Sequence, residues 1–147
     1  MAGPCLFCQI VARLREAAVV WEDERSLAFL DHRPLFPGHC LLIPKTHIAT
    51  LSDLPSQDIA PFFAAAQRLS GAVEEALGAE GSFVAINNRV SQSVPHLHAH
   101  VVPRKRKDGL KGFFWPRGKY ASAEEMEAIR LKLEKACVPA RPQLLLP

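Results

Sequence analysis

The sequence SVPHLHAHVVPR places three histidines, His96, His98 and His100, at every second position of an apolar run. Alternate side chains of a β-strand share a face, so an extended segment 96–102 puts the three imidazoles on one side and the intervening apolar residues on the other. Pro95 and the β-branched residues at 101 and 102 disfavour a helix. We therefore expect a strand whose apolar side packs on the core and whose imidazoles line an exposed or cleft face.

Two kinds of chemistry fit such a row of imidazoles. Three histidines can hold a catalytic zinc ion. Alternatively, one histidine is a nucleophile: with a reference pKa of about 6.5 it is mostly neutral at pH 7 and needs little activation to attack phosphorus. An ordinary amphipathic strand is the structural alternative, although clustered imidazoles repel one another once protonated. The spacing alone does not choose between the metal and the nucleophile.

A Cys-x-x-Cys pair, Cys5 and Cys8, lies near the N-terminus. Such a pair is redox-active, half of a metal site, or simply two reduced thiols, and a tetrahedral zinc ion needs two more ligands. Cys40 falls in an apolar strand and Cys137 at a helix end, so we interpret both as small core residues.

The remaining pattern predicts an α+β fold with one antiparallel sheet, because strands joined by short connections come before and after a long helix. Helical turns are expected within 8–15, and strands at 18–23, 26–34, 40–43, 83–86 and 98–102. Pro44 is expected to end the pairing of the third strand or to lie at a sheet edge. Apolar spacing predicts the long helix from an N-cap at Ser56 to a stop at Gly78. A C-terminal helix follows Ser122, with Glu125 completing a capping box.

Composition sets the class of protein. The 147 residues are 48% hydrophobic and 22% charged, which is typical of one globular domain, 1–147, with a core of about 5–120 and a C-terminal helix and tail at 121–147. The net charge of +3 permits an anionic ligand but makes nucleic acid an unlikely partner. No apolar run reaches the roughly 20 residues of a membrane span, and no secretory leader is evident, so we expect a cytoplasmic protein with reduced cysteines.

Several motifs together resemble the histidine triad (HIT) superfamily of nucleotide hydrolases and transferases. HLHAHVV is similar to its His-φ-His-φ-His-φ-φ signature, and CLFCQIV to the Cys-x-x-Cys of its zinc-containing bacterial-type members. LAFLDHRPLFPGHCLLIPKTH resembles the family hairpin, and NNRVSQSVPHLHAHVVPR covers the nucleotide loop and the triad. The resemblance runs from Cys5 to about Tyr120. It implies a HIT-like fold, an antiparallel sheet of about five strands with a long helix, and a homodimer.

The resemblance also implies catalytic roles. His98 would be the nucleophile that attacks the α-phosphorus of a nucleoside phosphate derivative, a dinucleoside polyphosphate or a nucleoside phosphoramidate, to form a covalent nucleotidyl-histidine. His100 would donate to a non-bridging phosphate oxygen, and Ser93 would offer a hydroxyl and a backbone N–H to the same phosphate or to the leaving group. A nucleotidyltransferase or phosphorylase of the same chemistry, or a non-catalytic nucleotide-binding module, are the alternatives.

Binding roles follow from the same resemblance. Asp31 would accept hydrogen bonds from the ribose hydroxyls, and Asn87 would lie near the phosphate or ribose, although Asn88 beside it is a second candidate. Gln92 would assist Ser93. His32 and His39 are interpreted as turn residues, and the basic loop around 104–107 as a solvated face.

For the metal, the resemblance implies four ligands: Cys5, Cys8, His47 and His96. Four protein ligands close a tetrahedral site, so the zinc would be structural. It would tie the N-terminus to the segment that carries His98.

Overall fold

The computed structural model describes residues 5–110 and 119–137. Contacts divide the chain into two units, 1–108 and 109–147. The first unit contains α1 (Leu6–Val11), β1 (Val19–Glu22), β2 (Ser26–Leu30), β3 (Cys40–Pro44), the short 3₁₀ helix η1 (Leu51–Asp53), α2 (Ser56–Leu77), β4 (Gly81–Ile86) and β5 (Ala99–Arg104). The second contains α3 (Ala123–Cys137). In the described part of the chain, none of the helices combines the length and the hydrophobicity of a membrane span.

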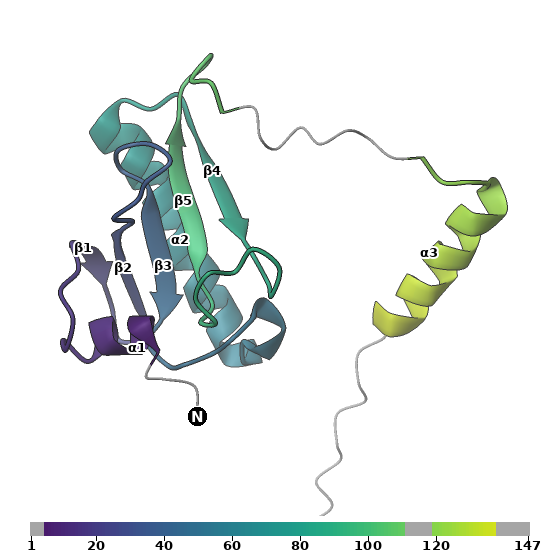
Figure 1. Cartoon of the computed structure of the whole chain (residues 1–147), viewed down its shortest axis with the longest axis horizontal. Coiled ribbons are helices and arrows are strands. Elements are labelled where there is room, and N and C mark those ends of the chain that lie inside the picture. Colours follow the sequence, from purple (N-terminus) through teal and green to yellow (C-terminus); the bar gives the residue numbers. More distant parts are fainter. Residues whose placement is uncertain (1–4, 111–118, 138–147) are drawn as a thin grey trace, which may run out of the picture. The chain divides into compact units, whose positions relative to one another are not determined.

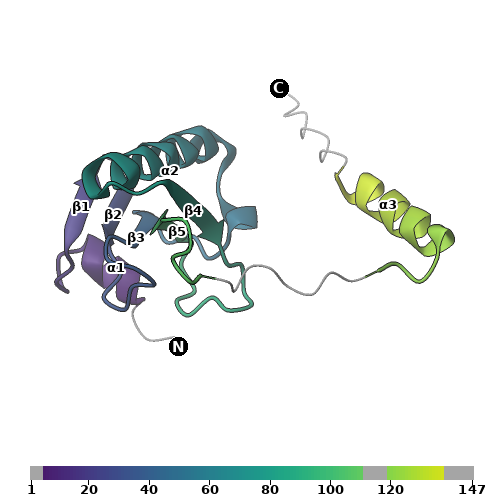
Figure 2. The same cartoon turned by 90° about the horizontal axis from the view of Figure 1, so that it is seen from above.

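One antiparallel five-stranded sheet organises the first unit, as the sequence predicted (Figure 1). Its strand order is β1-β2-β3-β5-β4, so β5 inserts between two strands that precede it in sequence. α2 crosses one face of the sheet and the short α1 lies at the opposite face (Figure 2). The central position of β5 places the end of the histidine segment beside β3.

Alternation along the strands separates two cores. Ala28, Leu42, Ala99 and Val101 pack with the buried side of α2. The side chains between them, Leu27, Phe29, Leu41 and Ile43, pack with Phe7 and Ile10 of α1 instead. The histidine segment follows the same rule, because Leu97, Ala99 and Val101 belong to the α2 core. His98 and His100 are therefore left to the α1 face.

The strand that carries the histidines differs from its prediction. β5 begins at Ala99 and not at residue 96 or 98, and it continues to Arg104. Neighbouring strands explain the difference, because pairing with both β3 and β4 begins at Ala99. Before that point the Leu97 N–H donates to the Ile48 carbonyl, outside any strand.

The helix predictions are confirmed with small shifts at their ends. α2 begins at Ser56 itself, with Pro55 at the N-cap, and ends at Leu77, with Gly78 at the C-cap in the left-handed conformation (φ 59°). Before α3, the Ser122 hydroxyl accepts from the Glu125 N–H at 3.1 Å, which is the predicted serine half of the capping box. The Glu125 carboxylate accepts from the N–H of Ala121 and not of Ser122. The end of the predicted C-terminal tail, 138–147, lies outside the described residues.

Candidate functional site

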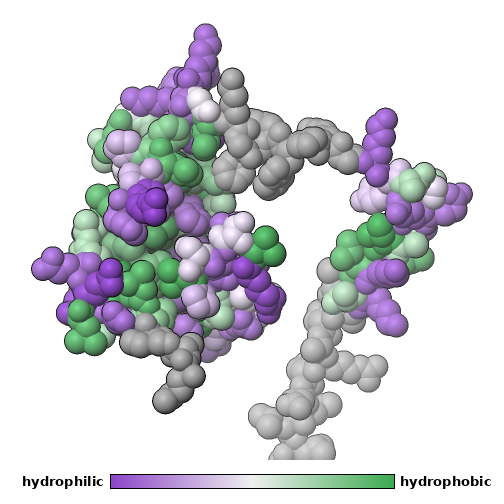
Figure 3. Space-filling model, in the orientation of Figure 1, coloured by the Kyte–Doolittle hydropathy of each residue, from purple (hydrophilic) through white to green (hydrophobic). Residues whose placement is uncertain are grey.

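A cavity of about 1100 Å³ opens on the α1 face of the sheet. His98, His100, Ser93 and Asp31 all line it, so four of the residues expected to act together do lie around one space. Its apolar wall comes from α1 and the adjoining strands: Leu6, Phe7, Ile10, Phe29 and Leu41. Figure 3 views the unit from the side of α1 and shows hydrophobic residues at this surface, flanked by hydrophilic ones. The cavity thus offers polar groups at one part and an apolar wall at another, as ligand pockets commonly do.

His98 is 2% exposed and held by its own backbone segment. Its Nδ1 lies 2.7 Å from the His96 carbonyl oxygen. Because a carbonyl only accepts, Nδ1 carries the proton and the neutral ring presents the lone pair of Nε2. The edge of Phe7 packs against the ring, with centroids 5.2 Å apart. Both contacts restrain the imidazole of a residue that lines the cavity.

His100 is held by a histidine that the sequence interpretation treated as a turn residue. His39 is 2% exposed, and its Nδ1 accepts from the Leu35 N–H at 3.1 Å. The proton of the neutral His39 ring is therefore on Nε2, which lies 2.9 Å from Nδ1 of His100. His100 accepts there, so its own proton is on Nε2. This chain of bonds makes His100 a hydrogen-bond donor on the side away from His39.

Burial keeps both of these rings neutral. Burial, followed by the neighbouring His98 and His39, lowers the pKa of His100 to about 4, against the opposing effect of the Asp31 carboxylate. Burial also lowers the pKa of His39, with Asp31 opposing the shift. Neither ring is charged at neutral pH, so the hydrogen-bond directions above hold under ordinary conditions.

Asp31 directly follows β2 and faces the same cavity. Its side chain is 17% exposed, and Oδ1 accepts from the Arg33 N–H at 2.9 Å. The second oxygen, Oδ2, lies 3.8 Å from Nδ1 of His39. The carboxylate is therefore oriented by its own turn and keeps acceptor capacity toward the cavity.

The loop residues divide into two groups. Ser93 lines the cavity, whereas Asn87, Asn88 and Gln92 are not among its described lining residues. The Gln92 amide accepts from the Arg89 N–H at 2.8 Å and donates to the Ala49 carbonyl at 2.6 Å. Asn88 accepts from the Leu51 N–H at 2.8 Å. These side chains fix the loop that presents Ser93.

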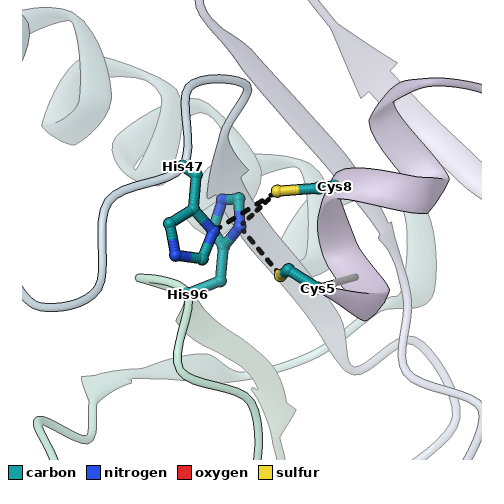
Figure 4. A group of neighbouring side chains, drawn as sticks. All are labelled: Cys5, Cys8, His47 and His96. Atoms are coloured by element: carbon teal, nitrogen blue, oxygen red, sulfur yellow. Dashed lines mark hydrogen bonds between the residues drawn. The ribbon is translucent and has the colours of Figure 1, made fainter. Parts of the chain in front are cut away.

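The four predicted metal ligands form a cluster of their own. Cys5, Cys8, His47 and His96 each place one donor atom within 4.8 Å of all the others (Figure 4). Nδ1 of His96 lies 3.5 Å from the Cys5 sulfur and 3.7 Å from that of Cys8, which in turn lies 3.3 Å from Nδ1 of His47. His96 is fully buried, so its imidazole does not lie on an exposed face. It comes from the bend before β5 and turns toward the thiols.

The chemistry of this cluster suits a tetrahedral ion. Two sulfurs and two imidazole nitrogens are a donor set typical of structural zinc sites, in which ligands lie roughly 3.3–3.8 Å apart at the usual bond lengths. Nε2 of His96 donates to the Pro44 carbonyl at 2.8 Å, which orients Nδ1 toward the thiols. Burial, followed by the neighbouring Cys5, raises the pKa of the Cys8 thiol. A bound cation would reverse that shift by favouring the thiolate.

His39 and the apolar wall are the parts of the site that the sequence interpretation missed. His39 immediately precedes β3 and comes two residues before Leu41. Alternation along that strand could have placed His39 on the α1 face, beside β5. Without knowing that β3 pairs with β5, the Pro-Gly turn before it favoured the turn interpretation.

Comparisons with known proteins identify the family of the chain. The HIT domain family matches residues 13–107. An uncharacterised HIT-like protein of Mycobacterium tuberculosis is 38% identical over 109 residues, covering 73% of this chain and 76% of that protein. An Arabidopsis thaliana adenylylsulfatase is 32% identical over 137 residues, 92% of this chain and 64% of that protein. A bis(5'-adenosyl)-triphosphatase of Dictyostelium discoideum is 33% identical over 97 residues, 65% of each chain.

Solved structures share the fold. A HIT family protein from Bacillus subtilis superposes with a TM-score of 0.81 and 32% identity, covering 92% of this chain and 99% of that one. A zinc-bound histidine triad family protein from Mycobacterium smegmatis has a TM-score of 0.69 and 38% identity, over 90% of this chain and 96% of that one.

Proposed function

Because the chain belongs to the HIT domain family, we propose that it is a nucleotide hydrolase that cleaves nucleoside phosphate derivatives at the α-phosphate through a covalent intermediate on His98. One observation carries the proposal. The bond from Nδ1 of His98 to the His96 carbonyl leaves Nε2 unprotonated, beside a cavity that Ser93, His100 and Asp31 also line. A nucleophile, hydrogen-bond donors and an anionic acceptor then surround one space.

In the first step, the Nε2 lone pair of His98 attacks the α-phosphorus. The new N–P bond forms as the bond from phosphorus to the leaving group breaks, and the leaving group departs with the electron pair and takes a proton from the surrounding donors or water. In the second step, water attacks the same phosphorus, the N–P bond breaks and a proton is released. The products are a nucleoside monophosphate and neutral His98, ready for another cycle.

His100 and Ser93 supply the donors for the phosphate. The Nε2–H of His100 is fixed by the bond that Nδ1 accepts from His39, so it requires no reorganisation when negative charge develops on a phosphate oxygen. Ser93 lines the same cavity, and its hydroxyl and backbone N–H are the donors it would offer there.

Asp31 binds the ribose, since a carboxylate accepts hydrogen bonds from two neighbouring hydroxyls. The base lies along the apolar wall that α1 provides. Asn87 follows β4 outside the described cavity lining, so its proposed contact is with a part of the phosphate or ribose that extends beyond that lining. Gln92 holds the loop after β4 in place through its bonds to Arg89 and Ala49. Any base can pack on this wall by stacking and burial, so the wall itself does not select the base.

Cys5, Cys8, His47 and His96 hold a structural zinc ion. When bound, the ion joins α1, the loop after β3 and the segment before β5 into one unit, without touching substrate. The chain's own residues then link it to the reaction, because the carbonyl of the ligand His96 is the group that orients His98. The zinc-bound relative from Mycobacterium smegmatis supports the choice of metal.

The similar proteins support an adenylylated substrate. One is named for cleaving an adenylyl sulfate and another for cleaving a bis(5'-adenosyl) triphosphate, and both substrates carry a nucleoside α-phosphate with a good leaving group. We therefore place adenylylated small molecules first in any substrate panel.

Turnover tests the proposal directly. A fluorogenic adenosine phosphoramidate should be cleaved by the wild type, whereas His98→Asn should lose activity by about 10³-fold or more, since a nucleophile and its covalent route disappear together. His32→Gln is the matched histidine control, because its side chain also lines the cavity but is 87% exposed and has no part in the proposed reaction. Equal turnover by wild type and His98→Asn would refute hydrolysis through His98. Products that shift to a nucleoside diphosphate on adding inorganic phosphate would identify a transferase instead.

A further inference from the structure

A row of four cavity-lining residues crosses the sheet from the triad to its β1 edge. His100 on β5 pairs with Leu41 on β3. Leu41 pairs in turn with Phe29 on β2, and Phe29 pairs with Val19 on β1. All four residues line the cavity. Because neighbouring strands lie about 4.8 Å apart, the row is about 14 Å long, which leaves room for a nucleotide laid along it.

This row gives a bound nucleoside a direction. In the proposed function the phosphate lies at His98 and His100, and the ribose lies at Asp31, directly after β2. β4, on the other side of β5, contributes no residue to the described cavity lining. The base therefore lies beyond the ribose, toward β1 and the segment 12–18 that precedes it. This placement rests on the proposed function.

Arg15 brings unused hydrogen-bond donors to this end of the cavity. Arg13, Arg15 and Glu16, all from the segment before β1, line it. The guanidinium of Arg13 is paired with the Glu22 carboxylate. The exposed side chain of Arg15 has no hydrogen bond or ion pair with any residue in the described part of the chain. Its donors are therefore available to a ligand.

The two purines offer different groups to a guanidinium, which has five N–H donors in a rigid fork and no acceptor. Guanine presents two adjacent acceptors, O6 and N7, whereas adenine presents the acceptor N7 beside the donor N6–H₂. Facing adenine, Arg15 loses one of two bonds and opposes a donor with a donor. Glu16 can only accept, and both purines carry an amino group, so its carboxylate does not separate them.

We propose that Arg15 selects the base, favouring guanine and other 6-oxopurines over adenine. The reaction at the α-phosphate is the one proposed above, and adenylylated compounds remain substrates with a lower kcat/KM. The apolar wall accepts any base, so the choice comes from the guanidinium. Because Arg15 is exposed, we expect the lower end of what a bidentate base contact gives, about fivefold to tenfold.

Matched substrates measure the preference. Guanosine and adenosine phosphoramidates with the same fluorogenic leaving group are compared by kcat/KM, and the wild type should favour guanosine about fivefold to tenfold. Arg15→Met keeps an apolar stem and removes the donors. Its kcat/KM for guanosine should fall to about that for adenosine, which itself changes less than about twofold. An unchanged ratio in Arg15→Met would overturn the proposal.

Arg13→Met is the matched control. Arg13 lines the same end of the cavity, but its guanidinium is held by Glu22. The variant should therefore keep the wild-type ratio of guanosine to adenosine. A ratio that falls to one in Arg13→Met and not in Arg15→Met would assign the preference to the wrong arginine and overturn the proposal.

Calorimetry with nucleoside monophosphates tests the same contact without turnover. Inosine monophosphate carries O6 and N7 but lacks the 2-amino group of guanosine monophosphate. Both should bind the wild type about fivefold to tenfold more tightly than adenosine monophosphate, and Arg15→Met should bind all three about equally. Inosine monophosphate that binds as weakly as adenosine monophosphate would place recognition at the 2-amino group and overturn the role of Arg15.

The binding data also separate this proposal from the proposed function. Equal affinities for the three nucleotides in an active hydrolase would overturn base selection by Arg15 and leave the hydrolase intact. The expected affinities and the expected loss in Arg15→Met, in a protein that turns over neither phosphoramidate, would support base selection and refute hydrolysis.

Discussion

Replacing His39 by leucine tests whether a buried residue outside the triad controls the reaction. The side chain makes two hydrogen bonds, accepting from the Leu35 N–H and donating to Nδ1 of His100. Leucine fills similar space and removes both. His100 then loses the contact that places its proton on Nε2, so the donor facing the phosphate is no longer fixed.

The size of the effect follows from the bonds lost. A neutral hydrogen bond has a net worth of about 0.5–1.5 kcal/mol, which converts to a fall in kcat of about twofold to tenfold. Deleting the donor altogether, in His100→Leu, should cost about 10²–10³-fold. The Leu35 N–H left without its partner should lower the free energy of unfolding by about 1–3 kcal/mol. KM should change little, because His39 does not line the substrate cavity.

Steady-state kinetics on the fluorogenic adenosine phosphoramidate, with urea unfolding alongside, measures both effects. His39→Gln is the conservative variant, because its amide can accept from Leu35 and donate to His100; it should recover most of the kcat. In the His100→Leu background, His39→Leu should have almost no further effect on kcat. Independent multiplication of the two losses would refute the argument that His39 acts through His100.

Four further outcomes follow from the structure. Because burial lowers the pKa of His100 to about 4, its ring resonances should titrate near pH 4 in NMR and not near the usual pH of about 6.5. The folded state then binds fewer protons than the unfolded state between these values, so stability should fall as the pH is lowered from about 6.5 to 4, and a flat stability profile there would contradict the assignment. Asp31→Asn should raise KM by about tenfold to hundredfold with a smaller change in kcat, as expected for a lost charge-assisted bond, and an unchanged KM would exclude it from ribose binding. Elemental analysis should give one zinc per chain in the wild type and none in Cys8→Ser. The melting temperature of Cys8→Ser should drop by about 10 °C or more, since each kcal/mol of lost stability lowers it by about 4 °C in a domain of this size. Equal metal content in the two proteins would remove Cys8 from the site. Sedimentation should detect a homodimer, in which Val84 on edge strand β4 (43% exposed) and Phe63 on α2 (42% exposed) are candidate contacts. Val84→Asp should favour the monomer, and a monomeric wild type would refute the homodimer.

Local pattern predicted much of the architecture. The helix α2, the three N-terminal strands and the antiparallel α+β class follow from apolar periodicity and turn residues, which act over short distances. Alternation in the histidine segment correctly separated Leu97, Ala99 and Val101 from the imidazoles. The local pattern could not predict where β5 begins, because a strand begins where its pairing with neighbouring strands begins, and those neighbours are distant in sequence.

The site shows the same division. His98 and His100 stand out by spacing, and their shared cavity with Ser93 and Asp31 agrees with the prediction. The inward turn of His96 depends on the bond from its Nε2 to Pro44, 52 residues away, and on thiols from the N-terminus. His39 reaches His100 only because β3 and β5 are neighbours. Contacts between segments far apart in sequence leave no local signal, so these roles required the structure.

Intact-mass analysis of rapidly quenched reactions tests the covalent intermediate most directly. With an adenylylated substrate and zinc-loaded protein, the wild type should gain the mass of one adenylyl group, and peptide mapping should place it on His98. His98→Asn, with His32→Gln as the reactive control, should gain nothing. An adduct on another residue, an adduct that persists in His98→Asn, or full turnover by a protein that never gains mass under any quench time would contradict the account.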